Sequence, residues 1–138
     1  MTGPSEHLTW AELACKDGTG YPLEWRTTRA PDLARLFEAI RAICGDQPIQ
    51  ILSAYRTPAH NRKIGGAPLS QHVEGRALDL RPPEGWTVAR FYDVVRTLHR
   101  TGGIGRYQVA GFVHVDVRPV DRLVAWNGGA QRKDDRDA

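Results

Sequence analysis

The stretch Ser70-Gln71-His72-Val73-Glu74-Gly75-Arg76-Ala77-Leu78-Asp79 decides the fold of this 138-residue chain. It places a histidine and an aspartate on either side of a glycine turn. If the residues after the turn are extended, side chains alternate between two faces, so Leu78 faces the core and Asp79 faces away from it. The small residue Ala77 lies on the same face as Asp79 and leaves room there for an ion.

A second informative segment is the predicted strand Phe112–Arg118. Its valines share one face, and His114, Asp116 and Arg118 share the other. Taken alone, this pattern also fits a half-exposed strand without a site. Two neutral imidazoles and one carboxylate are a common ligand set of catalytic zinc, with a fourth position left for water, and His72, Asp79 and His114 can supply it.

The rest of the chain predicts a mixture of helices and strands. Capping and apolar periodicity indicate three helices, at about residues 10–15, 31–43 and 88–98. Extended runs are expected at residues 49–55, 76–81, 104–107 and 112–118. Residues 56–69 are expected to be mainly loop with one helical turn near His60, and Gly102-Gly103 to end the third helix. Because helices and strands do not alternate regularly, the predicted class is α+β, a small antiparallel sheet flanked by helices.

Length and composition indicate one domain at residues 1–130, followed by a charged tail at residues 131–138 that we expect to be disordered. The net charge of 19 − 16 = +3 is modest, and no basic cluster or aromatic–basic motif indicates nucleic-acid binding. No apolar run is long enough to cross a membrane, and the polar N-terminus predicts no secretory signal. Cys15 and Cys44 are expected to be free and buried, and too few for a disulfide framework or a cysteine-based metal site.

These residues carry a resemblance. The pattern Ser70-x-His72-x-x-Gly75-x-Ala77-x-Asp79 fills the fixed positions of the motif of the zinc D-Ala-D-Ala metallopeptidases, peptidase M15, which share the hedgehog/DD-peptidase fold. Residues 53–57 resemble the family's arginine segment. Residues 105–107 and 112–116 resemble the closing strand of its short bacterial and phage branch. The likeness runs from about Thr9 to Trp126.

The resemblance implies roles for individual residues. His72, Asp79 and His114 would bind Zn²⁺. Arg56 would lie beside the metal and either grip a substrate carboxylate or polarise the scissile carbonyl. Ser70 would hydrogen-bond within the loop that orients His72, acting on the ligand and not as a nucleophile.

One departure from the family pattern concerns the acid that acts as general base. Many relatives carry Glu or Asp three residues before the last zinc histidine, where this chain has Gly111. On the last strand they often have His-x-His, where this chain has His114-x-Asp116. Two assignments stay open. In the first, His114 binds zinc and Asp116 activates the water or orients His114; in the second, Asp116 is the ligand and His114 its catalytic partner. Imidazole, the commoner zinc ligand, favours the first.

The resulting hypothesis is a zinc peptidase, either a D,D-carboxypeptidase or a peptidoglycan endopeptidase, that cuts stem peptides or cross-links of peptidoglycan and is a monomer. The alternative is an inactive zinc-containing binding module of the same fold, as in hedgehog-type relatives. A wall enzyme without a secretory signal would have to be released by lysis, carried in a phage particle or exported by another route, and a phage or prophage lysin fits by resemblance.

Overall fold

The computed structural model describes residues 2–128. Its helical elements are α1 (Trp10–Leu13), the 3-10 helix η1 (Leu23–Trp25), α2 (Ala30–Ile43), α3 (Pro58–Lys63) and α4 (Val88–Leu98). Its strands are β1 (Ile51–Ser53), β2 (Ala77–Leu80), β3 (Gly102–Tyr107), β4 (Phe112–Asp116) and β5 (Leu123–Asn127). They form one sheet of order β1-β2-β4-β3-β5, in which only the β3–β5 pair is parallel. The predicted α+β class is confirmed.

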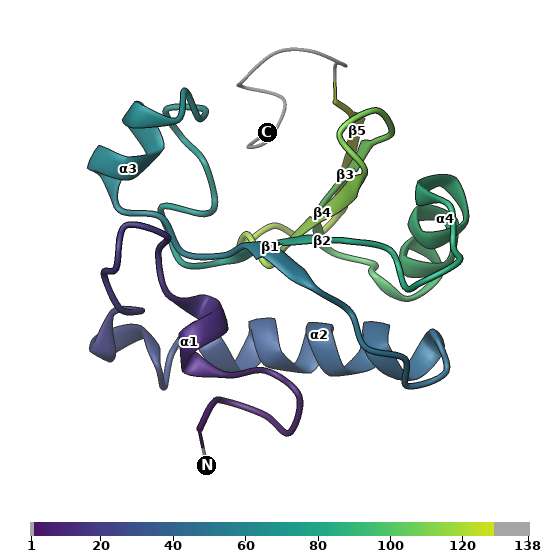
Figure 1. Cartoon of the computed structure of the whole chain (residues 1–138), viewed down its shortest axis with the longest axis horizontal. Coiled ribbons are helices and arrows are strands. Elements are labelled where there is room, and N and C mark those ends of the chain that lie inside the picture. Colours follow the sequence, from purple (N-terminus) through teal and green to yellow (C-terminus); the bar gives the residue numbers. More distant parts are fainter. Residues whose placement is uncertain (1, 129–138) are drawn as a thin grey trace.

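The helices divide between the two sides of the sheet. Figure 1 shows α2 running beneath the sheet with α1 and α4 near it, while α3 stands away from them on the other side. The core fills the space between the first group of helices and one face of the sheet, and it includes Leu33, Phe37, Leu78, Phe91 and Val115. The face of β2 and β4 opposite this core is therefore left for polar side chains.

The helices begin where the sequence places their caps. The Thr9 side chain accepts a hydrogen bond from the Glu12 backbone N–H, and the Glu12 side chain accepts one from the Thr9 N–H, which completes the predicted capping box. Thr87 caps α4 in the same way through the N–H of Arg90. These caps satisfy backbone donors that the first turn of a helix leaves unpaired.

Several details of the predicted secondary structure differ from the fold. The strand expected over residues 49–55 pairs only over Ile51–Ser53, where its register shifts against β2. The single turn near His60 is a six-residue helix, α3, because Thr57 caps it. Gly102 and Gly103 do not end α4 but begin β3. The parallel edge strand β5 was not predicted at all.

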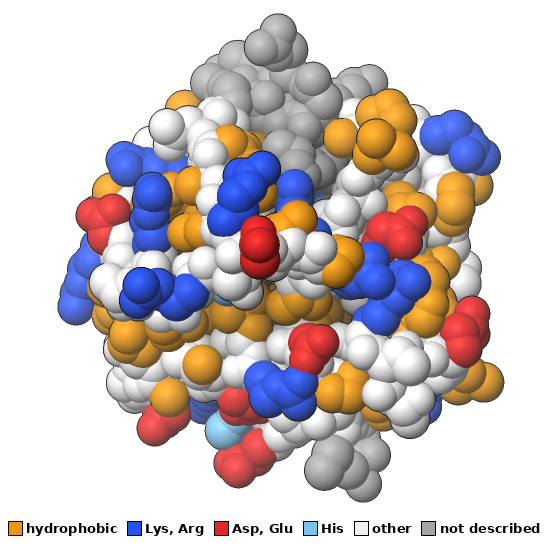
Figure 2. Space-filling view, turned by 180° about the vertical axis from the view of Figure 1, so that it is seen from behind, with side chains coloured by type: hydrophobic (Ala, Val, Ile, Leu, Met, Phe, Trp, Pro, Cys, Tyr) orange, Lys and Arg blue, Asp and Glu red, His pale blue; other side chains and the backbone are white. Residues whose placement is uncertain are grey.

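Other expectations concern the cysteines, the surface and the tail. Cys15 and Cys44 are free and buried, as predicted. None of the helices within residues 2–128 is both long and apolar enough to cross a membrane. Figure 2 shows basic and acidic side chains interspersed on one face of the molecule, without a continuous basic block. The predicted tail, residues 131–138, lies outside the described residues.

Candidate active site

The three predicted ligands meet on the polar face of the sheet. Asp79 on β2 lies opposite His114 on β4 in the strand register, and His72 lies in the turn that leads into β2. Asp79 Oδ1 is 3.1 Å from His72 Nε2 and 3.0 Å from His114 Nδ1. All three side chains are almost completely buried. Strand pairing and one turn thus bring together residues 35 positions apart.

Two hydrogen bonds hold His72, one through its ring and one through its backbone N–H. Its Nδ1–H donates to the carbonyl of Ala54 over 2.6 Å, because a carbonyl oxygen can only accept. This leaves the lone pair on Nε2, the atom that faces Asp79. Ser70 Oγ accepts the backbone N–H of His72 over 3.1 Å and so fixes the turn that carries the ring. Ser70 itself is buried.

The second ring nitrogen of His114 faces Asp116. His114 Nε2 lies 2.7 Å from Asp116 Oδ2, as the shared strand face requires. The Asp116 carboxylate also accepts hydrogen bonds from the backbone N–H, Nε and Nη2 of Arg118. With its Nε2–H directed at Asp116, His114 presents Nδ1 to Asp79. Asp116 is therefore placed behind His114, on the side away from Asp79.

These contacts test whether a cation fits. The lone pairs of His72 Nε2 and His114 Nδ1 both point at the anionic Asp79 Oδ1. These three electron-rich atoms repel one another unless a proton or a cation lies between them. The ligand atoms lie within 4.8 Å of one another. A tetrahedral zinc ion with bonds of about 2.0–2.1 Å holds its ligands about 3.3 Å apart, so a small displacement of the side chains accommodates it.

Burial, hydrogen bonds and nearby charges shift the pKa values of all three side chains. Burial lowers the pKa of His72 and keeps its ring neutral, as a metal ligand must be. Burial would also lower the pKa of His114, but the hydrogen bonds to Asp116 and Asp79 outweigh it and raise that pKa. For Asp79, burial opposes ionisation, but the charges and hydrogen bonds of His72 and His114 hold its pKa well below the usual range.

Arg56 reaches the second oxygen of the same aspartate. Its Nη2 lies 3.4 Å from Asp79 Oδ2, and its Nε donates to Ser53 Oγ over 3.1 Å. Nη1 donates to Asn61 Oδ1 over 3.3 Å, and the side chain is almost fully buried. The guanidinium is thus held beside the ligand set by three side chains, from β1, α3 and β2.

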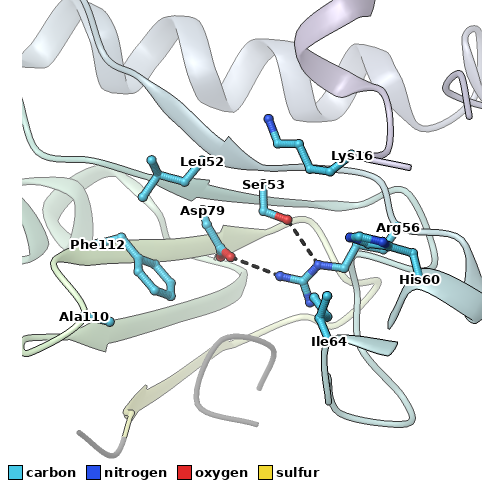
Figure 3. Close-up of a pocket in the computed structure, with 9 residues that line it drawn as sticks. All are labelled: Lys16, Leu52, Ser53, Arg56, His60, Ile64, Asp79, Ala110 and Phe112. Carbon is cyan, nitrogen blue, oxygen red and sulfur yellow. Dashed lines mark hydrogen bonds and ion pairs between the residues drawn. The ribbon is translucent and has the colours of Figure 1, made fainter. Parts of the chain in front are cut away.

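A cavity of about 480 Å³ opens beside these residues. In Figure 3, Arg56 and His60 lie at one end of the pocket and Leu52, Phe112 and Ala110 at the other, with Asp79 and Ser53 between them. Lys16 and Ile64 complete its lining. Asp79 is the only predicted ligand, and the only acid, among the described residues that line it. The cavity therefore combines cationic side chains with an apolar wall, next to the proposed metal ligands.

The turn between His72 and Asp79 depends on Gly75. Its φ is +69°, and a Cβ at this position would lie 2.6 Å from the ring of Trp25. We expect Gly75→Ala to destabilise the protein by about 3 kcal/mol, since a strained φ and a clash with a packed ring act together. Gly85→Ala is the matched control, because Gly85 also has a positive φ but open space around it. Urea unfolding should show a clearly smaller loss for Gly85→Ala; equal losses would contradict the clash.

Tyr21 holds the same turn from outside. Its hydroxyl donates to the Gly75 carbonyl over 2.6 Å, and burial raises its pKa to about 12. The neutral phenol is therefore favoured in the folded state, so its stabilisation is complete below the unfolded pKa of about 10 and is lost as the pH rises through about 12. Tyr21→Phe should cost about 1 kcal/mol at pH 7. Unfolding free energies between pH 9 and 12 should fall less steeply for the variant than for wild type; parallel curves would contradict this.

Several further residues contact the site residues. Asn61 supports Arg56 and donates to the carbonyl of Ala67 over 2.8 Å. Trp126 on β5 packs against His114, with ring centroids 5.2 Å apart. Gly103 leaves the space for the Asp116 carboxylate, since a Cβ there would lie 2.2 Å from Oδ2. An asparagine or a glycine in isolation gives no signal of such a role, because each contact depends on the folded sheet.

Comparisons with known proteins agree with the family resemblance that the sequence motif indicates. A family model described as Peptidase M15 matches residues 6–116. The chain is 36% identical over 78 residues to the zinc D-Ala-D-Ala carboxypeptidase of Streptomyces albus G, which covers 54% of this chain and 31% of that protein. It is 30% identical over 105 residues to the probable peptidoglycan L,D-endopeptidase MepK of Haemophilus influenzae, which covers 71% of this chain and 54% of the relative.

A third relative is the peptidoglycan L,D-endopeptidase MepK of Escherichia coli K12, 32% identical over 78 residues, with coverage of 53% and 42%. The chain thus spans between about a third and about half of the length of these curated relatives. The matched family segment includes Arg56 and the three converging side chains, and it ends at Asp116. The resemblance inferred from the motif is confirmed, and the chain belongs to the peptidase M15 family.

Proposed function

We propose that this protein is a zinc-dependent peptidase that hydrolyses amide bonds in the peptides of peptidoglycan. The observation that carries the proposal is the convergence of His72 Nε2, Asp79 Oδ1 and His114 Nδ1 on one buried point beside a cavity. The names of the relatives, a zinc D-Ala-D-Ala carboxypeptidase and peptidoglycan L,D-endopeptidases, support both the metal and the substrate class.

In this proposal the three converging atoms hold the zinc ion. Zinc bound there would supply a Lewis acid and bring the pKa of a bound water to about 7. The protein contributes the ligand geometry: Ala54 and Ser70 fix His72, and strand pairing fixes Asp79 against His114. Arg56 restrains the second oxygen of Asp79, which favours one ligand orientation.

Asp116 acts through His114 in this proposal. Its carboxylate holds the Nε2–H of His114 and is itself paired with Arg118, while it does not line the cavity. A carboxylate behind a metal-bound imidazole selects the tautomer and increases the basicity of the ligand. Of the two assignments left open by the sequence, this geometry favours His114 as ligand and Asp116 as the residue that orients it.

Arg56 and the cavity suggest how a substrate is held. The guanidinium lies at one end of the cavity, and Lys16 also lines it, so both basic residues face the same space. Leu52 and Phe112 form an apolar wall at the other end. This combination suits a short peptide that carries a free carboxylate and small apolar side chains, as stem peptides do.

Digestion of purified sacculi and muropeptides, followed by mass spectrometry, tests the proposal and identifies the bond. We expect released peptides with the wild-type protein, their loss after treatment with a chelator, and their return when zinc is added back. Stoichiometric zinc without any product would favour the binding-module alternative, which Gly111 in place of the usual acid supports. Products that persist in metal-depleted protein would overturn the zinc mechanism.

A further inference from the structure

A second group of metal-ligating side chains lies at the rim of the same cavity. Cys15 Sγ, an Asp17 carboxylate oxygen and a ring nitrogen of His60 all lie within 4.8 Å of one another. Cys15 and Asp17 belong to the loop after α1, and His60 to α3. We propose that these three side chains form a second divalent-metal site, separate from His72, Asp79 and His114, that takes Zn²⁺ or a similar thiophilic ion.

One residue, Thr57, links the Asp17 carboxylate to the backbone of α3 that carries His60. Thr57 Oγ1 donates to Asp17 Oδ2 over 2.8 Å and accepts the backbone N–H of His60 over 3.1 Å. The backbone N–H of Thr19 donates to the other Asp17 oxygen over 2.8 Å. Each Asp17 oxygen keeps a lone pair for a metal. The Asp17 carboxylate is therefore oriented before an ion binds, and the backbone that carries His60 is held close to it, which lowers the entropic cost of binding.

The backbone that carries the Cys15 thiol is held in a closed loop. The Cys15 N–H donates to the Thr19 carbonyl over 2.8 Å, and the Gly18 N–H donates to the Cys15 carbonyl over 3.0 Å. Gly18 has a φ of +98°, which lets the chain turn back within five residues. Cys15 is 4% exposed, whereas Asp17 is exposed and His60 is half-buried. An ion would therefore enter from solvent at Asp17 and bind the thiol on the inner side.

The donor atoms select the kind of ion. One thiolate, one imidazole and one carboxylate suit zinc, while magnesium and calcium prefer oxygen ligands alone. Binding requires that the Cys15 thiol lose its proton to solvent. The thiolate and the Asp17 carboxylate then carry two negative charges, which balance the charge of the ion. Because His60 also lines the cavity, a metal ion bound by its ring would lie next to the proposed substrate path.

The sulfur ligand makes this site distinguishable from the first one. His72, Asp79 and His114 offer no sulfur, so in the Co²⁺-loaded protein a thiolate-to-cobalt charge-transfer band in the near ultraviolet reports only a cysteine ligand. We expect this band in wild type, in His72→Ala and in Cys44→Ser, the control for the other buried thiol. We expect its loss in Cys15→Ser and its weakening in His60→Ala.

Zinc content measured under buffered free zinc gives the second readout. We expect two equivalents in wild type and one in Asp17→Asn, an exposed position whose replacement leaves the core unchanged. The second site would be overturned if the charge-transfer band persisted in Cys15→Ser. It would also be overturned if wild type bound a single zinc equivalent and His72→Ala bound none. If the Cys15-dependent band is present but His72→Ala binds as much zinc as wild type, the result counts against the proposed peptidase centre alone.

Discussion

Replacing Asp79 by alanine is expected to remove zinc from the central site and to lower the rate of muropeptide hydrolysis by about 10³-fold or more. Asp79 Oδ1 contacts both histidines, and Oδ2 contacts Arg56, so this one carboxylate connects the whole site. A catalytic metal supplies several kcal/mol of transition-state stabilisation, and each 1.36 kcal/mol is tenfold in rate. Zinc content and initial rates on one defined muropeptide measure the two effects.

The matched control for this change is Asp93→Ala, because Asp93 is an exposed aspartate on α4. It should keep both zinc and activity. Circular dichroism of Asp79→Ala shows whether the fold survives, and His72→Ala gives an independent removal of a ligand. Asp79→Ala protein that folds, binds the same amount of zinc and retains its rate would refute the assignment of this ligand.

Replacing Asp116 by asparagine is expected to lower zinc affinity by about 10- to 100-fold. Burial would raise the pKa of Asp116, but Arg118 and His114 hold it well below the usual range, so the group is an anion that orients and polarises His114. An amide lacks this charge. Hydrolysis should therefore be weak at limiting zinc and should recover substantially when free zinc exceeds the new dissociation constant. Isothermal titration with zinc and rates at several zinc concentrations measure this.

The same experiment separates the two catalytic roles considered for Asp116. If the carboxylate were the general base, Asp116→Asn would bind zinc normally and stay inactive at every zinc concentration. Gly103→Ala provides a second test, since its Cβ would lie 2.2 Å from Asp116 Oδ2 and would displace the carboxylate without removing its charge. It should weaken zinc binding in the same direction as Asp116→Asn.

Local rules of the sequence were sufficient to predict the placement of the central residues. Alternation along a strand placed Asp79 opposite to the buried Leu78, and placed His114 and Asp116 on one face, where their side chains are 2.7 Å apart. The Thr9 and Thr87 caps likewise depend only on residues three positions away. Such features are predictable because the interacting groups are neighbours along the chain.

Features that depend on distant segments were not predictable in this way. The strand β5 pairs directly with β3, although β4 lies between them in the sequence. The residues next to Trp126 in the sequence therefore do not indicate that it packs against His114. Cys15 and His60 come together only because the loop after α1 and the cap of α3 meet through Thr57. With only two cysteines in the chain, no cysteine-based metal site was expected, and no local pattern links Cys15 to the distant His60.

The most direct test of the central claim is a crystal structure of the zinc-loaded protein with anomalous diffraction data collected on both sides of the zinc edge. We predict an anomalous peak at bonding distance, about 2.0–2.2 Å, from His72 Nε2, Asp79 Oδ1 and His114 Nδ1, with Asp116 still on Nε2 of His114. An anomalous peak bound by Asp116 in place of His114, or no zinc among these three side chains, would contradict it.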